Sequence, residues 1–126
     1  MYLLDTNVLI WWVTDNDKLS DRARSIIRDP ENQIFVSAAS VWEIAIKSSL
    51  GKLEISKHFY HDLAKEPFTE LSVSFQHAIL VRDLPHIHAD PFDRLLIAQA
   101  RVENLTVITS DPSFKRYEIA VIKAKS

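Results

Sequence analysis

The sequence of 126 residues contains no cysteine and a single glycine, Gly51. The absence of cysteine excludes disulfide bonds, thiolate zinc sites and cysteine nucleophiles, and it suits a reducing cytoplasm. Walker loops, dinucleotide-binding fingerprints and the nucleophile elbow each need several glycines. The sequence therefore excludes nucleotide-cofactor enzymes and α/β-hydrolases.

Long apolar segments and an excess of basic residues are also missing. The longest apolar run, Val8–Val13, is far shorter than the ~20 residues of a transmembrane helix. No basic segment precedes the first apolar residues, so we expect neither a signal peptide nor a membrane partner. The chain has 15 basic and 17 acidic residues and a net charge of −2, whereas nucleic-acid binding proteins usually carry a basic excess. These features predict a cytoplasmic protein in which any nucleic-acid site depends on local clusters of charge.

Short apolar segments rich in β-branched residues alternate with segments of helical periodicity. Their apolar residues are nearly continuous, as in strands that are buried on both faces of a parallel sheet. The predicted strands are Tyr2–Leu4, Ile34–Val36, Leu71–Val73, Thr106–Thr109 and Ile119–Ile122. Because strands separated by helices form βαβ units, we predict an α/β fold, a three-layer sandwich around a central, mostly parallel sheet. Residues 1–126 are expected to form a single domain.

Capping residues mark the ends of the predicted helices. A serine or aspartate is expected to cap the N-terminus of five helices, at Ser20, Ser40, Ser56, Ser74 and Asp90. The first four helices are expected to end near Arg28, at Gly51, before Pro67 and before Pro85.

Four acidic residues are predicted to meet at one edge of the sheet. Asp5 directly follows the first predicted strand, and Asp111 follows the fourth. Glu43 and Asp93 fall in the first turns of two predicted helices, and Glu43's helix directly follows a strand. Parallel strands present their carboxyl ends at the same edge, which is where ligands bind in open α/β sheets.

Each acid also has a structural explanation. Glu43 and Asp93 stand three residues after a capping residue, which is the spacing of a capping box. Asp111 precedes a proline and suits a turn, and Asp5 can cap a helix at Val8–Val13. Asp5 is the hardest to explain by capping alone, because a carboxylate buried at a sheet edge costs several kcal/mol without compensation.

The four acids together indicate a metal site. Carboxylates that converge on one edge repel one another and resist ionisation unless a cation holds them. Magnesium prefers hard oxygen ligands and typically takes one or two carboxylates, waters and substrate phosphates. An acidic cluster without cysteine therefore predicts metal-assisted phosphoryl chemistry.

The same residues resemble the four motifs of the PIN domain family. The first and last motifs are similar to Leu3–Ile10 and Thr109–Phe114, and the second is similar to Ser37–Leu53. The most specific segment, His88–Ala100, resembles one subgroup of the VapC toxins. The resemblance therefore extends from Leu3 to Phe114, almost the whole chain.

The resemblance implies an endoribonuclease that uses Mg²⁺ or Mn²⁺ and acts as the toxin of a toxin–antitoxin pair. It also implies a small VapB-like antitoxin as partner and a homodimer. On the same basis Asp5, Glu43, Asp93 and Asp111 form the acidic quartet of the active site. Asp5 and Asp93 are expected to hold the ion, while Glu43 and Asp111 hold its waters or a second ion.

Several residues near the four acids are expected to have capping, supporting or solvated roles. Asp90 lies in the third motif but is assigned to capping, whereas Asn7 and Thr109 are expected to support the acids. His86 and His88 alternate on a loop, and without a further histidine or cysteine nearby we expect solvated side chains rather than a zinc site.

Basic and aromatic residues suggest binding surfaces. Five basic residues flank the acids and either bind RNA phosphates or form a solvated face: Lys47, Lys52, Arg94, Lys115 and Arg116. The helix predicted at Val8–Val13 is apolar all round, which indicates either burial or contact with another chain. We expect at least one of Trp11 and Trp12 to lie at an interface, with core burial as the alternative.

Three other functions deserve comparison. A receiver-type signalling domain needs adjacent acids after the first strand and an aspartate after a central strand, but Asp5 stands alone and Ser74 follows Leu71–Val73. A haloacid-dehalogenase-like phosphatase needs an Asp-x-Asp motif, and the second position here is Asn7. A non-catalytic, PIN-like RNA-binding module is disfavoured by the intact acidic quartet.

Overall fold

A computed structural model of the protein describes residues 1–125. Its sheet has five strands in the order β3-β2-β1-β4-β5, and every neighbouring pair is parallel. The strands are β1 (Tyr2–Leu4), β2 (Ile34–Ser37), β3 (Thr69–Leu71), β4 (Thr106–Thr109) and β5 (Val121–Lys123). The predicted α/β class and parallel sheet are confirmed.

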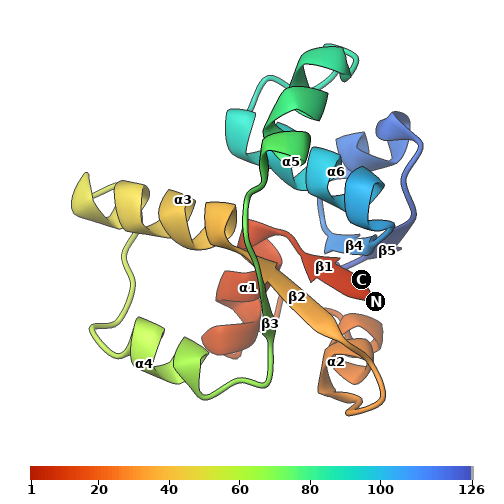
Figure 1. The fold of residues 1–126 in the computed structure, drawn as a ribbon. Helices are drawn as coiled ribbons and strands as arrows, with labels where there is room; N and C mark the ends of the chain where they lie inside the picture. Colours follow the sequence, from red (N-terminus) through yellow and green to blue (C-terminus); the bar gives the residue numbers. More distant parts are fainter. Residues whose placement is uncertain (126) are drawn as a thin grey trace.

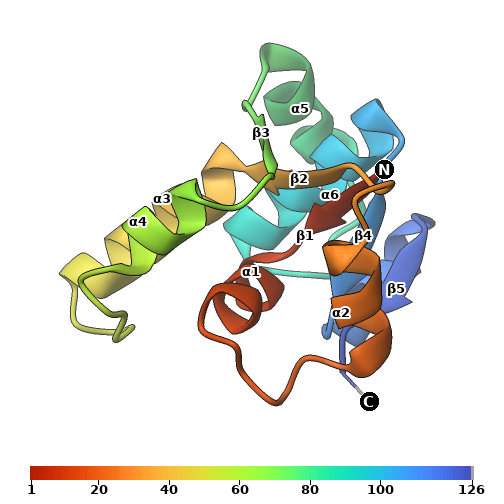
Figure 2. The same cartoon turned by 90° about the horizontal axis from the view of Figure 1, so that it is seen from below.

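Helices cover both faces of the sheet, as Figures 1 and 2 show. The α-helices are α1 (Thr6–Val13), α2 (Asp21–Arg28), α3 (Ala38–Ser49), α4 (Phe59–Ala64), α5 (Phe75–Leu80) and α6 (Pro91–Glu103). Two 3₁₀-helices complete the set, η1 (Val81–Asp83) and η2 (Pro112–Tyr117). The α1 and α2 helices lie on one face and α5 and α6 on the other, while α3 projects beyond the end of β2 (Figure 1). The predicted three-layer sandwich is therefore confirmed.

The core consists of one apolar cluster on each face of the sheet. Successive side chains of a strand point to opposite faces. Accordingly, Leu4 packs with Val8 in the cluster under α1 and α2, whereas Leu3 packs with Ile97 in the cluster under α6. Each of these side chains is fully buried, and burial of one such side chain contributes about 1.5–3 kcal/mol to the free energy of unfolding. This packing holds the carboxyl ends of β1 and β4 rigidly beside each other.

The start of α3 differs from the prediction. Ser37 is the N-cap, since its Oγ accepts a hydrogen bond from the Ala39 backbone N–H at 3.0 Å. The alanines that follow Ser37 are strong helix formers, so the helix begins before Ser40, which is a buried residue inside it. The predicted capping box of Ser40 and Glu43 is wrong, and Glu43 lies in the second turn of α3.

The two edge strands are also shifted. β3 is predicted at Leu71–Val73 but ends at Leu71, which pairs with Ser37, the last residue of β2. Beyond that point β2 becomes α3, so later residues have no strand to pair with. β5 begins at Val121 because Glu118 has a left-handed conformation (φ 59°) at the end of η2 and the next residues form the connection.

Most of the other predicted helix ends are confirmed. Ser20, Ser74 and Asp90 are N-caps whose side chains accept backbone hydrogen bonds. Gly51 follows the C-cap of α3 with φ 72°, a left-handed conformation that glycine adopts without steric cost. The exception is α4, which begins after His58 rather than after Ser56. None of the helices in the described part of the chain has the length and apolar character of a membrane span.

Candidate active site

Asp5 lies at the carboxyl end of β1 and caps α1. Its Oδ1 accepts the Val8 N–H at 2.8 Å, and its Oδ2 accepts the hydroxyl hydrogen of Thr109. The Asp5 backbone N–H donates to the carbonyl of Ile108 in β4 at 3.1 Å. The residue is only 4% exposed, and burial raises its pKa to about 6 although both hydrogen bonds act in the opposite direction. Asp5 is thus a fixed carboxylate that is poorly stabilised in its charged form.

Glu43 reaches the same edge from α3. Its Oε1 accepts the Thr6 hydroxyl at 2.7 Å, and its Oε2 is 2.5 Å from Nζ of Lys47, one helical turn further on. The hydrogen bond to Glu43 raises the pKa of Lys47, which therefore stays charged among the acids. Thr6 is a site residue that the sequence analysis missed, although it directly follows Asp5.

Asp93 lies in the first turn of α6, as predicted. Burial and, to a smaller extent, the neighbouring carboxylate of Asp90 raise the pKa of Asp93 to about 7, although His88 acts to lower it. Asp90 caps the helix as expected, because its Oδ1 accepts the backbone N–H groups of Phe92 at 2.8 Å and Asp93 at 3.2 Å. The capping role of Asp90 and the place of Asp93 in the first turn of α6 agree with the sequence analysis.

Asp111 follows β4 and caps η2. Its Oδ1 accepts the Ser113 N–H at 2.9 Å, and its Oδ2 is 2.8 Å from Nε2 of His88. Burial acts to raise the pKa of Asp111, but the hydrogen bonds from Ser113 and His88 outweigh it, so the pKa is below its ordinary value. The charged form of Asp111 is therefore stabilised, in contrast to those of Asp5 and Asp93.

The loop before α6 contains the second residue that the sequence analysis missed. His88 was expected to be solvated, but its side chain is only 19% exposed and its Nε2 lies 2.9 Å from Asp93 Oδ2. His86 is exposed, as expected. The sequence offered one signal for a role in the site, since His88 lies two residues before the cap of α6. It did not show that the ring turns toward Asp111.

The acids surround one small cavity of about 120 Å³. Its lining comes from β1, α1, α3, α6 and the segment after β4: Asp5, Thr6, Asn7, Glu43, Lys47, Asp90, Asp93 and Asp111. All four predicted acids are thus brought together, and Thr109 supports Asp5 as expected. The donors are carboxylate oxygens, and two carboxylates resist ionisation, so the cavity fits a hard divalent cation such as Mg²⁺ or Mn²⁺.

One of the predicted RNA-contacting residues has a different role. Arg94 is 8% exposed and points into the protein rather than toward the acids. Its guanidinium donates hydrogen bonds of 2.8–3.3 Å to the backbone carbonyls of Val81, Leu84 and Pro85. Both interpretations of Arg94 from sequence, phosphate binding and a solvated face, are wrong. By contrast, Lys52, Lys115 and Arg116 are exposed.

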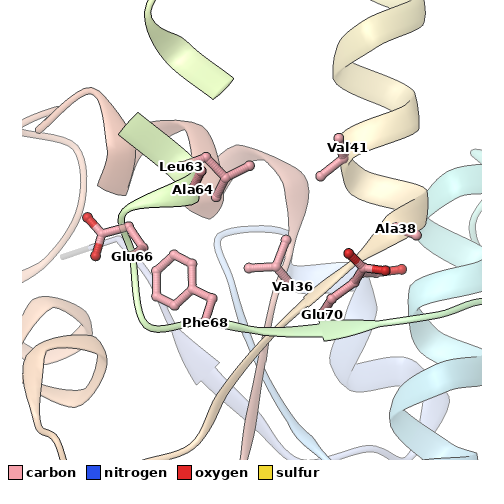
Figure 3. A pocket seen from close by; sticks show the side chains of 9 residues that line it. Val36, Ala38, Val41, Leu63, Ala64, Glu66, Phe68 and Glu70 are labelled. Carbon is pink, nitrogen blue, oxygen red and sulfur yellow. The ribbon is translucent and has the colours of Figure 1, made fainter. Parts of the chain in front are cut away.

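A larger cavity of about 300 Å³ lies away from the acidic cluster. Figure 3 shows Val36, Val41, Leu63 and Phe68 around it, from β2, α3, α4 and the segment that leads into β3. Two glutamates, Glu66 and Glu70, complete its lining. This mostly apolar cavity lacks the convergent acids that phosphoryl chemistry requires.

One known protein family matches almost the whole chain. The PIN domain family matches residues 2–120 of the chain. The chain belongs to the PIN domain family. Among proteins with curated descriptions, none matches this sequence.

Several solved structures have a similar fold. This PIN domain resembles VapBC2 from Rickettsia felis bound to a DNA fragment from its promoter, at TM-score 0.73 and 17% identity over 97% of each chain. It also resembles FitAcB from Neisseria gonorrhoeae, at TM-score 0.68 and 24% identity over 98% of each chain. DNA-bound VapBC from Salmonella typhimurium matches at TM-score 0.68 and 20% identity, over 97% of this chain and 96% of that one. At such identities these likenesses establish the fold.

Proposed function

We propose that this PIN domain, residues 1–126, is an Mg²⁺- or Mn²⁺-dependent endoribonuclease and the toxin of a toxin–antitoxin pair. The observation that carries the proposal is the convergence of Asp5 and Asp93, both with raised pKa values, on one carboxylate-lined cavity. Perturbed acids that share a cavity are a common property of catalytic sites. A non-catalytic RNA-binding module would have no need for carboxylates that repel one another in one cavity.

Asp5 and Asp93 would hold the ion, and Glu43 and Asp111 would hold its waters or a second ion. A bound divalent ion polarises a phosphoryl oxygen and lowers the pKa of the water that attacks phosphorus. Around it, Thr109 fixes one oxygen of Asp5 and Thr6 fixes one of Glu43. The ammonium of Lys47 offsets part of the negative charge and can bind a phosphate.

An aromatic pair that includes one exposed ring supports a nucleic-acid substrate. Trp42 and Phe92 are the neighbours in sequence of Glu43 and Asp93, and their rings meet edge to face with centroids 5.4 Å apart. Trp42 is 60% exposed, so its indole is open to a planar ligand. Nucleobases of single-stranded RNA stack on such aromatic rings.

A small VapB-like antitoxin and a second copy of the chain are the proposed protein partners. The similarity to VapBC complexes supports the first, and a cytoplasmic location follows from the same proposal. Trp11 and Trp12 are half-buried against the core cluster of α1, and the Trp12 indole N–H is buried without a partner in residues 1–125. If either ring also lies in a homodimer interface, its change to alanine weakens association in sedimentation experiments.

Replacement of Asp5 by asparagine tests the enzyme proposal. Asn caps a helix about as well as Asp, so Asp5→Asn keeps the fold but removes the charge that holds the cation. We expect RNA cleavage in Mg²⁺ or Mn²⁺ to fall by several orders of magnitude, while RNA binding through the exposed basic residues persists. Asp17→Asn, a change of an exposed acid, is the matched control and should leave cleavage unchanged.

Two further measurements complete the test. EDTA should stop cleavage by the wild type, and millimolar Mn²⁺ should raise its melting temperature by ligand linkage, with most of the increase lost in Asp93→Asn. Cleavage that continues in EDTA or in folded Asp5→Asn contradicts the metal-nuclease proposal. RNA binding without cleavage by the wild type would favour the binding-module alternative.

A further inference from the structure

His88 lies between two acids of the site, and its role can be decided from its hydrogen bonds. Its Nε2 is 2.8 Å from Asp111 Oδ2 and 2.9 Å from Asp93 Oδ2. One nitrogen and two carboxylate oxygens within 4.8 Å of one another also have the composition of a metal site. His88 is therefore either a ligand of the ion or a donor to the acids, and the two roles need different protonation of the ring.

The other ring nitrogen distinguishes these roles. Nδ1 of His88 accepts the backbone N–H of Asp90 at 3.2 Å. A ring nitrogen that accepts a hydrogen bond carries no hydrogen, so the proton of the neutral imidazole is on Nε2. A metal at Nε2 would require the proton on Nδ1, where it would face the Asp90 N–H, a second donor. The hydrogen-bond pattern thus favours the donor role.

The ring is also held in place by its surroundings. The His88 backbone N–H donates to the Tyr117 hydroxyl at 2.6 Å, and the ring packs edge to face against Phe114 with centroids 6.2 Å apart. The His88 carbonyl accepts a hydrogen bond from Arg94 at 3.4 Å. Nε2–H is therefore directed to Asp111 and lies beside the carboxylate of Asp93 before any ligand arrives.

We infer that His88 is a positioning residue whose Nε2–H donates to Asp111 and, 2.9 Å from Asp93 Oδ2, keeps the two carboxylates close together. Asp93 is on α6 and Asp111 follows β4, so without the polar N–H between them the two charges repel and separate. The inference concerns the site of the proposed nuclease and rests on that function for its consequence. It assigns His88 to the hydrogen-bonded support of the ligands and excludes it from the ion's ligands, which are oxygen atoms.

The tautomer of His88 can be measured without metal. In ¹⁵N-histidine-labelled, metal-free protein at about pH 8, where an ordinary imidazole is neutral, ring nitrogens with and without a proton have distinct chemical shifts. The spectrum of His88→Gln identifies the His88 signals by their loss. We expect the proton on Nε2. A proton on Nδ1 overturns the inference, whether or not the protein is a nuclease.

Substitutions test the consequence for metal binding. The amide of Gln reaches the position of Nε2 and can donate there, whereas Asn replaces only the nearer part of the ring and Ala neither. We expect His88→Ala and His88→Asn to bind Mn²⁺ about 10–100-fold more weakly in calorimetry, as is usual when the support of a ligand is lost. His88→Gln should retain most of the affinity, and His86→Ala, a change of the exposed neighbour, all of it.

The outcomes separate the two proposals. If the wild type binds Mn²⁺ and His88→Gln loses as much affinity as His88→Ala, the donor role is wrong while the metal-nuclease proposal stands. If the wild type binds neither Mn²⁺ nor Mg²⁺, the metal-nuclease proposal fails and the tautomer measurement still decides the role of His88.

Discussion

The hydroxyl of Thr109 donates a hydrogen bond to Asp5 Oδ2 and joins the end of β4 to the end of β1. The same hydroxyl oxygen accepts the Asp111 backbone N–H at 3.0 Å. One threonine thus supports two acids of the quartet. Its position also explains why Asp5 stays in place although burial raises its pKa.

Thr109→Val keeps the shape of this side chain and removes its donor. A buried charged group that loses a hydrogen bond costs about 1.5–3 kcal/mol of unfolding free energy, and we expect a loss of this size at about pH 8, where Asp5 is ionised. Thr109→Ser keeps the hydroxyl and should lose clearly less. Urea denaturation in EDTA measures both variants. Equal losses in Val and Ser would mean that the methyl group, rather than the hydrogen bond, stabilises this edge.

The raised pKa values predict how stability depends on pH. Asp5 and Asp93 have pKa values of about 6 and about 7 in the folded protein against an ordinary value of 3.8, so between about pH 4 and pH 7 the folded state binds more protons than the unfolded state. By linkage, these two groups make the metal-free protein less stable as the pH rises through that range. The affinity for a divalent metal ion should increase as the pH rises over the same range, because the ion competes with protons for the carboxylates.

Variants isolate this dependence from that of the histidines. The difference in unfolding free energy between Asp93→Asn and the wild type should grow in favour of the variant from about pH 4 to pH 7 and level off above. For Asp5→Asn the difference should grow in the same way and level off above about pH 6. A difference that does not change with pH would show that these carboxylates have ordinary pKa values in the folded protein.

Arg94 is predicted to matter for stability rather than for substrate binding. Arg94→Met keeps much of the apolar volume but leaves the carbonyls of Val81, Leu84 and Pro85 without their donor. A buried polar group that loses its partner costs about 1–3 kcal/mol, and the Val81 carbonyl still accepts the Leu84 N–H, so we expect a total loss on the order of 3 kcal/mol. Arg101→Met, on the exposed side of the same helix, is the control and should cost little. Denaturation midpoints of the two variants decide the comparison.

Trp42 is predicted to contribute to RNA affinity. Stacking of one base on an aromatic ring is worth about 1–3 kcal/mol, so Trp42→Ala should raise the Kd for single-stranded RNA roughly 5–100-fold. Tyr60→Ala removes another exposed aromatic ring, from α4, and should leave the Kd unchanged. Fluorescence anisotropy in Ca²⁺ or EDTA measures binding without cleavage. If Trp42→Ala instead alters only the sedimentation coefficient, the ring belongs to a protein interface.

Local sequence patterns predicted most of the fold and the four acids. The buried strands are short apolar runs, and the helix caps at Ser20, Ser74 and Asp90 are formed by neighbouring residues. Asp5 and Asp111 follow parallel strands, so their place at one edge of the sheet follows from strand direction alone. These features depend on residues that are close in sequence or on general rules of sheet topology.

Other features were decided only when distant segments packed together. His88 meets Asp111, 23 residues away, because the hydroxyl of Tyr117 in η2 accepts the backbone N–H groups of Ile87 and His88 in the loop before α6. Arg94 is buried because the turn after η1 presents carbonyls to it, and this contact has no periodic pattern in the sequence. The start of α3 shifted because Ser37 lies at the end of β2 and caps the helix directly. A local pattern specifies which way a side chain points along its own element, whereas burial and hydrogen-bond partners depend on what the rest of the chain places opposite it.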